Sequence, residues 1–357
     1  MIPKKFVSPA RAWSLPLLGA LLTGCSGVVL KPSGDMAAQQ AHLITVAFLL
    51  MLVIIVPVIG LSLFFAWRYR ASNEEATYEP EFHHSNKVEF VAWGASIVII
   101  IILASLTWIY THRLDPYRPL ERISEGRAIP TDVKPLQVQV VAMRDRWLFI
   151  YPEQGVAVVN ELAAPVDRPI EFSITGTTVM NSFFIPALAG QIYSMPGMQT
   201  KLHAVINKPG EYEGFSANYS GANFSGMRFK FHGVDEAGFE QWLDKVKAGK
   251  DGLDRNAFLS MEALKDPQRP YDEQSVVAKP VQYFGSVDKG LYDAVLRMCV
   301  DASVPCTGGH YMGAASHAAA MEAHGDGEAA AHDMHDMAGM HDMHEAEPAP
   351  AAADSAK

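Results

Sequence analysis

The run LITVAFLLMLVIIVPVIGLSLFFAW, residues 43–67, contains no charged side chain. A second run, FVAWGASIVIIIILASLTWIYT at residues 90–111, is also free of charge. A helix needs about 20 mainly apolar residues to cross the roughly 30 Å hydrocarbon core of a bilayer. The two runs therefore predict a pair of membrane helices, at residues 42–67 and 88–112.

Basic residues indicate that the segment between the two runs is cytoplasmic. Arg68, Arg70 and Lys87 lie close to the ends of the predicted helices, and cytoplasmic loops carry an excess of lysine and arginine next to the membrane. Residues 68–87 are therefore expected inside the cell. The N-terminal segment, residues 25–41, and the chain from residue 113 onward then lie on the outer side.

The N-terminus has the layout of an export signal. Basic residues come first, the short apolar segment WSLPLLGALL follows, and LTGC ends the pattern. This order predicts a secretory signal peptide at residues 1–24. LTGC resembles a bacterial lipobox, which implies cleavage before Cys25 and acylation of its sulfur. The alternative is a cysteine buried in an uncut helix, for which the apolar run is short.

After a polar linker at residues 113–133, the pattern changes to short segments with β character. Many alternate with period 2 or are rich in β-branched residues, and Gly, Pro and Asn separate them at near-regular spacing, which is typical of a sandwich or barrel. Residues 134–234 are therefore predicted to form one all-β domain. Its segments are LQVQVVAM, WLFIYPE, GVAVVNEL, PIEFSIT, NSFFIP, TKLHAVI, EYEGFSA and MRFKFHGV.

The C-terminal part divides into a helical region and a tail. Residues 235–248 and the segment SVDKGLYDAVLRMCV have helical amphipathic patterns, so residues 235–300 are predicted to be helical. From Gly309 the composition shifts to Ala, His, Met, Asp and Glu, which cannot build a packed core. Residues 301–357 are predicted to be a disordered tail.

Charge and cysteine content narrow the function classes. The net charge of −10 argues against a nucleic-acid partner. Three cysteines are too few for a disulfide scaffold. Cys299 and Cys306 fall on the exported side, where their short separation permits a small disulfide loop. Free thiols and metal ligation are the alternatives.

Several long segments, in order, resemble one known family. They are the lipobox, the two apolar runs, FAWRYRAS, HSNKVEFVAW, FIYPEQGVAVVNE, VMNSFFIP, QIYSMPGMQT and YSGANFSGM. Together they resemble subunit II of bacterial quinol oxidases of the cytochrome bo type, in the haem–copper oxidase superfamily. The resemblance runs from about Cys25 to beyond Tyr292. It implies a membrane α plus all-β fold class: a two-helix transmembrane hairpin, then a periplasmic cupredoxin-like β-sandwich with short C-terminal helices.

The loop SANYSGANFSGM, residues 216–227, takes the place of a copper-ligand loop in this resemblance. In related cytochrome c oxidases, subunit II holds two copper ions with an H-S-F/W-x-x-P element and a C-x-E-x-C-x-x-x-H-x-x-M loop. Serine hydroxyls are poor ligands for mixed-valence copper, so no metal is expected in the folded domain. The lost ligand positions are Asn181, Ser216, Asn218, Ser220 and Phe224, while Met227 keeps its type and is expected in the core.

The expected electron donor changes with the loop. Family members that accept electrons from cytochrome c carry a W-x-W element, whereas here Asp145 stands first and Trp147, expected in the core, second. The resemblance therefore implies a quinol donor and no cytochrome c partner. It also implies that this chain binds no cofactor, that subunit I holds two haems, one copper and ubiquinol, and that subunits III and IV and membrane lipid are further partners.

Glu89 opens the second apolar run in SNKVEFVAW. From the residues alone, a carboxylate here is stabilised by the helix macrodipole and by headgroup water. The resemblance implies a further role, because the family places a glutamate here at the cytoplasmic mouth of a proton pathway into subunit I. A carboxylate at the water edge of a helix bundle can collect protons. Glu89 is therefore expected to be a proton-entry residue. His83 and His84 are interpreted as solvated loop residues, with proton collection at the same surface as the alternative.

The tail repeats histidine and methionine. Imidazole and thioether groups both suit copper, so one interpretation is a weak copper site, and the other is a solvated extension without a function. The residues concerned are His332, His335, His341, His344, Met334, Met337, Met340 and Met343.

These observations predict a lipid-anchored, multi-pass chain of the bacterial inner membrane with its large C-terminal domain in the periplasm. The expected function is subunit II of a proton-translocating oxidase that oxidises ubiquinol and reduces oxygen to water, with structural and proton-entry roles and no catalytic residue in this chain. The alternative is a periplasmic copper-handling or oxidase-assembly lipoprotein, which would be recovered free of oxidase subunits. A cytochrome c oxidase subunit with ligands elsewhere is disfavoured, because the β-domain has no cysteine.

Overall fold

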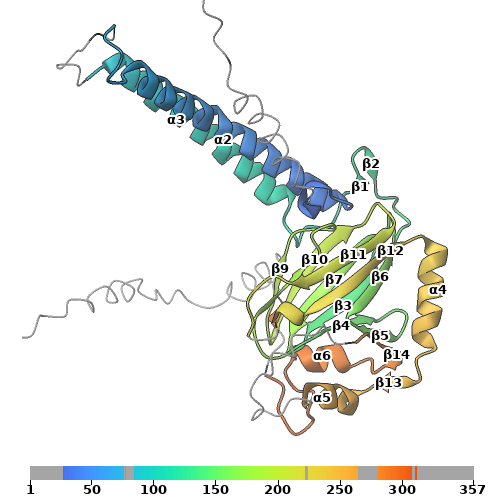
Figure 1. Cartoon of the computed structure of the whole chain (residues 1–357). Helices are drawn as coiled ribbons and strands as arrows, with labels where there is room; N and C mark the ends of the chain where they lie inside the picture. Colours follow the sequence, from blue (N-terminus) through green and yellow to red (C-terminus); the bar gives the residue numbers. More distant parts are fainter. Residues whose placement is uncertain are drawn as a thin grey trace, which may run out of the picture. The chain divides into compact units, whose positions relative to one another are not determined.

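Two long helices and a β-domain of two sheets make up the described part of the chain (Figure 1). The computed structural model describes residues 27–75, 77, 84–221, 224–263, 280–307 and 310–311. Cys25, His83 and the histidines and methionines predicted as a copper site in the tail lie outside the described residues.

The two charge-free runs form the long helices α2 (Asp35–Arg68) and α3 (Asn86–Arg113). Both are long and apolar enough to cross a membrane. A 3-10 turn, η2 (Val28–Leu30), precedes them. Helix α2 begins at Asp35 rather than at the predicted residue 42, because Met36 and Ala37 in its first turn are buried and Met36 belongs to the core of the β-domain.

Two sheets form the β-domain. One has eight strands in the order β13-β14-β5-β4-β3-β7-β10-β15, and the other has five in the order β6-β12-β11-β8-β9. The linker contributes a small hairpin of β1 (Arg122–Ser124) and β2 (Arg127–Ala128). The remaining strands are β3 (Leu136–Ala142), β4 (Trp147–Tyr151), β5 (Val156–Val159), β6 (Glu161–Pro165), β7 (Pro169–Gly176), β8 (Asn181–Phe184), β9 (Ile192–Ser194), β10 (Met198–Val205), β11 (Gly210–Ser216), β12 (Arg228–Val234), β13 (Asp251–Leu253), β14 (Gln282–Val287) and β15 (His310–Tyr311).

Asn160 carries the chain from one sheet to the other. The segment GVAVVNEL, predicted as one strand, divides here into β5 and β6, which belong to different sheets. Asn160 has a positive φ of 58°, a conformation that asparagine adopts more readily than most residues. Its side-chain oxygen accepts a hydrogen bond of 2.8 Å from the backbone N–H of Trp147, which fixes the bend.

Aromatic side chains from both sheets fill the core. Phe149 of β4 lies edge-on to Phe229 of β12 with ring centroids 5.0 Å apart. Phe183 of β8 stacks on the same Phe229 at 5.4 Å. Such pairs add to the hydrophobic stabilisation of buried rings. The alternation along β3 and β12, with buried and partly exposed residues in turn, follows the period-2 pattern of the sequence.

The C-terminal region requires a correction. Residues 235–300 contain α4 (Glu236–Lys247), α5 (Arg255–Ala263) and α6 (Leu291–Leu296), but also strands β13 and β14. The segment SVDKGLYDAVLRMCV is helical only within α6. Strand β14 forms backbone pairs with β5 in the antiparallel sense, and this pairing buries Phe284. The pairing stabilises a strand where the local sequence predicted a helix.

The predicted tail boundary at residue 301 is also too early. A disulfide joins Cys299 and Cys306, whose Cα atoms lie 4.8 Å apart. Strand β15 then pairs in parallel with β10, with His310 opposite Met198. The covalent link and the strand pairing give residues 301–307 and 310–311 defined positions in the β-domain.

Candidate functional site

Four of the six expected copper-ligand positions meet in the β-domain. Asn181 begins β8, Ser216 ends β11, and Ser220 and Met227 lie in the connection to β12. The side-chain amide nitrogen of Asn181 lies 3.3 Å from the Ser220 hydroxyl oxygen and 3.3 Å from Met227 Sδ. The Ser216 hydroxyl donates a hydrogen bond to the side-chain amide oxygen Oδ1 of Asn181.

Three members of this polar cluster are buried, and Ser220 is partly buried. Asn181, Ser216 and Met227 are 1%, 4% and 0% exposed. The backbone N–H of Ser216 donates to the Met227 carbonyl oxygen at 3.0 Å, and the Trp147 indole N–H donates to the same oxygen at 3.3 Å. Hydrogen bonds within the domain offset the cost of burying these polar groups. The cluster therefore fixes the connection between β11 and β12 against the start of β8.

The donor set of the cluster does not fit a copper pair. It offers two hydroxyls, one amide and one thioether, whereas copper of mixed valence is held by thiolates and imidazoles. Within the described ranges, no group of three or more His, Cys, Asp or Glu side chains is placed to hold a metal ion. The four side chains of the cluster therefore do not match the ligand set of a two-copper centre.

The other two expected positions lie outside the buried cluster. The side chain of Asn218 donates to the Tyr219 carbonyl oxygen at 3.4 Å. Phe224, in the short turn η3 (Phe224–Gly226), packs edge-on to the exposed ring of Tyr219 with centroids 5.1 Å apart. These contacts stay within the loop.

Residues 145–147, which take the place of the W-x-W element in the resemblance, are buried in the β-domain. Asp145 forms an ion pair of 2.9 Å with Arg146, and both are buried. Trp147 is fully buried between Phe183 and Phe229, as expected for a core residue. No indole from this element reaches the surface.

Glu89 lies in the first turn of α3, at the end of the helix remote from the β-domain (Figure 1). Its carboxylate is 2.8 Å from His84 Nδ1, and the two side chains are 53% and 56% exposed. Its backbone N–H donates to the Ser85 carbonyl oxygen at 3.0 Å. A half-exposed carboxylate beside an imidazole can exchange protons with water.

Comparison with known proteins assigns the family. Residues 135–234 match the family model "Cytochrome C oxidase subunit II, periplasmic domain", and residues 272–303 match "COX Aromatic Rich Motif". The chain is 46% identical to cytochrome bo(3) ubiquinol oxidase subunit 2 of Pseudomonas aeruginosa, over 85% of this chain and 86% of that protein. It is 44% identical to ubiquinol oxidase subunit 2 of Acetobacter aceti, over 77% and 84%. The chain belongs to the ubiquinol oxidase subunit 2 family.

Among solved structures, the β-domain is similar to the periplasmic domain of subunit II of cytochrome oxidase (CoxB) of Bradyrhizobium japonicum. The identity is 21% and the TM-score 0.30, over 31% of this chain and 91% of that one. The family assignment rests on the relatives and the family models instead. It confirms the predicted family and the predicted order of a helix hairpin followed by a periplasmic β-sandwich.

One polar centre of this ubiquinol oxidase subunit 2 relative was missed from sequence. Glu161 of β6 accepts hydrogen bonds from the Trp242 indole N–H at 2.8 Å and the Tyr283 hydroxyl at 3.0 Å. Burial opposes ionisation of Glu161, but the His232 imidazole at 3.8 Å, the hydrogen bonds from Trp242 and Tyr283, and the charge of Lys245 lower its pKa to about 2. Glu161 thus joins the sandwich to α4 and to β14 of the aromatic-rich motif.

The signal for this centre was present only in part. Trp242 stands on the apolar face predicted for α4, and a buried indole N–H needs an acceptor. Its partner lies in a strand predicted from the apolar residues around Glu161, and Tyr283 comes from a region predicted as helix. The contacts of Glu161 with Trp242 and Tyr283 cannot be predicted without knowing the order of the strands in the sheets.

Proposed function

We propose that this chain serves as subunit II of a proton-translocating oxidase in the bacterial inner membrane, whose complex oxidises ubiquinol and reduces oxygen to water. The polar cluster of Asn181, Ser216 and Met227 carries the proposal. Because its groups satisfy one another and offer no donor set for copper, an electron from a soluble haem protein has no metal site to enter in this domain. A quinol dissolved in the membrane is the donor that this arrangement suits.

The redox groups of the complex are assigned to subunit I. Two haems and one copper there carry out oxygen reduction, and this chain contributes no catalytic residue. Exposed apolar faces on α2 and α3 support packing against subunit I and membrane lipid. Subunits III and IV complete the complex, and cytochrome c is not a partner. Acylation of Cys25 would add a lipid anchor on the periplasmic side.

Glu89 is proposed as a proton-entry residue. It stands at the cytoplasmic end of α3, half-exposed and 2.8 Å from His84. A proton taken from water by His84 can pass to the carboxylate across this contact, and from there to a buried relay in the neighbouring subunit.

The proton-entry role is tested by measuring turnover and proton uptake of the complex with Glu89→Gln, Glu89→Asp and the control Glu75→Gln. Glu75 lies in the same cytoplasmic segment and carries the same charge. Loss of rate in Glu89→Gln with retention in the other two is expected. Equal rates in all three would contradict the role.

The metal content of the complex tests the assignment of copper. The complex is purified through a tag on this chain and washed with a chelator to remove loosely held ions. About two irons per copper are expected, because only the site in subunit I binds copper. An excess of copper over iron would mean that this chain holds a copper pair after all.

A further inference from the structure

Three consecutive apolar side chains are exposed in the short turn η2, which precedes the first membrane helix. Val28, Val29 and Leu30 are 54%, 41% and 53% exposed. A run of three exposed apolar residues is unfavourable in water, and such a surface marks a contact with another apolar partner. The turn is therefore expected to have an apolar neighbour that the described part of the chain does not supply.

The segment that follows the turn is fixed to the β-domain. The backbone N–H of Gly34 donates a hydrogen bond of 2.9 Å to the Ala187 carbonyl oxygen, and Lys208 Nζ donates one of 3.1 Å to the Pro32 carbonyl oxygen. A Cβ atom on Gly34 would lie 2.5 Å from the Val205 carbonyl oxygen, so glycine is required for this close approach. These contacts give η2 a defined place beside α2.

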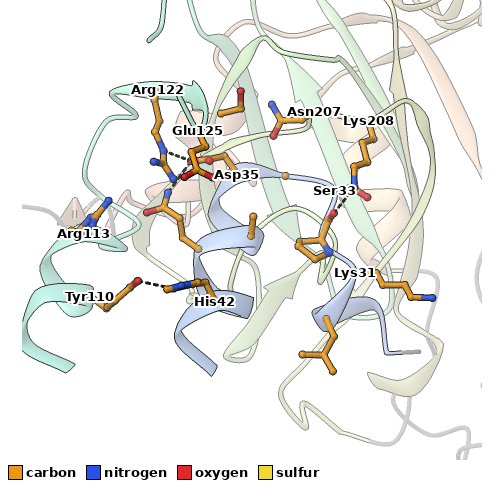
Figure 2. Close-up of a pocket in the computed structure, with 16 residues that line it drawn as sticks. Lys31, Ser33, Asp35, His42, Tyr110, Arg113, Arg122, Glu125, Asn207 and Lys208 are labelled. Carbon is orange, nitrogen blue, oxygen red and sulfur yellow. Dashed lines mark hydrogen bonds and ion pairs between the residues drawn. The ribbon is translucent and has the colours of Figure 1, made fainter. Parts of the chain in front are cut away.

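The turn lies at the edge of the membrane. Leu30 and His42 line the same cavity, of about 740 Å³, and His42 directly precedes the charge-free run of α2. Figure 2 shows Lys31 displaced from Asp35 toward the level of His42. The run at residues 43–67 is about 37 Å long at 1.5 Å per residue, which exceeds the roughly 30 Å of hydrocarbon. Groups at the level of its first residues therefore lie at the boundary of acyl chains and headgroups.

The polar groups of the turn suit that boundary. The backbone N–H of Leu30 donates to the Gly27 carbonyl oxygen at 3.0 Å, and that of Lys31 donates to the Val28 carbonyl oxygen at 3.1 Å. Satisfied backbone groups lower the cost of leaving water. Lys31 is exposed, and a lysine can extend its ammonium group into the headgroup layer while its stem covers apolar surface. Apolar residues with a lysine at their edge are typical of segments that lie in a membrane interface.

We propose that η2 inserts Val28, Val29 and Leu30 into the headgroup boundary of the periplasmic leaflet, as a lipid contact separate from the two membrane helices. The leaflet follows from the family model, which places the β-domain in the periplasm. The partner is lipid rather than protein because the turn lies beside α2 at the level where that helix enters the bilayer. Because the next segment is fixed to the β-domain, insertion holds that domain close to the membrane surface.

The test places a nitroxide spin label on Val29→Cys in the complex, purified through a tag on this chain and reconstituted in lipid nanodiscs. Electron paramagnetic resonance measures collisions of the label with oxygen, which concentrates among acyl chains, and with a water-soluble nickel chelate. The matched control is Val281→Cys, an exposed valine before β14, on the side of the β-domain remote from the helices (Figure 1). Wild-type complex treated with the same label gives the background from native thiols.

The label at residue 29 should collide with oxygen and lose its collisions with the nickel chelate, whereas the label at residue 281 should keep them. The change Val28→Asp/Leu30→Asp, made together with the label, should restore collisions with the chelate, because carboxylates are costly in an apolar layer. The conservative exchange Val28→Leu/Leu30→Val should leave the label among the lipids.

Three results would overturn the proposal. Equal collisions with the chelate at residues 29 and 281 would mean that the turn lies in water. Loss of collisions with both reagents at residue 29 would mean that a partner subunit covers the turn. Unchanged oxygen collisions in the aspartate variant would mean that an acyl group on Cys25, and not the turn, holds this segment at the membrane. None of these readings depends on whether quinol or cytochrome c supplies electrons to the complex.

Discussion

Replacing Glu161 by Gln perturbs the polar centre that joins the sandwich to α4 and β14. The substitution keeps the shape and removes the charge. The carboxylate is 9% exposed, 2.8 Å from the Trp242 indole nitrogen, 3.0 Å from the Tyr283 hydroxyl and 3.9 Å from Lys245 Nζ. Its pKa of about 2 in the folded chain compares with an ordinary value of 4.5.

The size of the effect follows from that difference in pKa. Each pKa unit corresponds to about 1.4 kcal/mol, so the shift corresponds to about 3 kcal/mol. Because solvent screens the partly exposed Lys245 and His232, we expect Glu161→Gln to lower the free energy of unfolding at pH 7 by about 2–3 kcal/mol.

The pH dependence has a definite sign. A carboxylate with a lowered pKa in the folded state stabilises the fold above its unfolded pKa and ceases to do so as it protonates. The wild type should therefore lose this stability as the pH falls from about 4.5 to about 2, while the Gln variant should lose less over that range.

The assay is urea unfolding of the full chain in detergent, followed by tryptophan fluorescence. The matched control is Glu213→Gln, which removes a 60% exposed carboxylate that pairs with Arg228, and it should cost less than about 0.5 kcal/mol. If Glu161→Gln unfolds at the same urea concentration as this control, the assigned role of the centre is refuted.

Three further perturbations give separate tests. Gly214→Ala places a Cβ against the buried ring of Phe229 and should destabilise the β-domain by about 1–3 kcal/mol in urea unfolding, and an unchanged midpoint would contradict the packing. Cys299→Ser opens the loop closed by Cys306, which should cost about 2.5 kcal/mol and make thermal unfolding insensitive to reductant, unlike the wild type. A peptide of residues 332–344 should bind copper at micromolar concentration in a titration, and absence of binding would remove the copper interpretation of the tail.

Features with a local cause were predictable from sequence. The membrane helices follow from the absence of charge over residues 43–67 and 90–111, a condition that few other structures meet. The strands of the sandwich follow from period-2 alternation bounded by turn residues. The face of α4 that carries Trp242 follows from helical periodicity in the same way, and its residues are buried.

Features with a distant cause were not predictable. The early start of α2 depends on burial of Met36 in the β-domain, and local sequence does not show that contact. Residues 282–287 were predicted as helix, but they form strand β14. The strand is stabilised by pairing with β5, which is far away in the chain, so the local sequence does not show it. The break of one predicted strand at Asn160 had a local signal, because asparagine tolerates a positive φ. The passage of the chain from one sheet to the other at this residue had no local signal.

The candidate site shows the same division. The resemblance identified four of the lost copper-ligand positions that the structure brings together. Their side chains form one hydrogen-bonded cluster: Asn181, Ser216, Ser220 and Met227.

The central claim is that this chain belongs to an oxidase fed by quinol. The most direct measurement is oxygen uptake by the complex purified through a tag on this chain, supplied in parallel with a reduced short-chain quinol and with reduced cytochrome c. Uptake with quinol and none with cytochrome c is predicted. Uptake with cytochrome c would contradict the interpretation of the Ser216 loop, and a preparation free of oxidase subunits would contradict the claim itself.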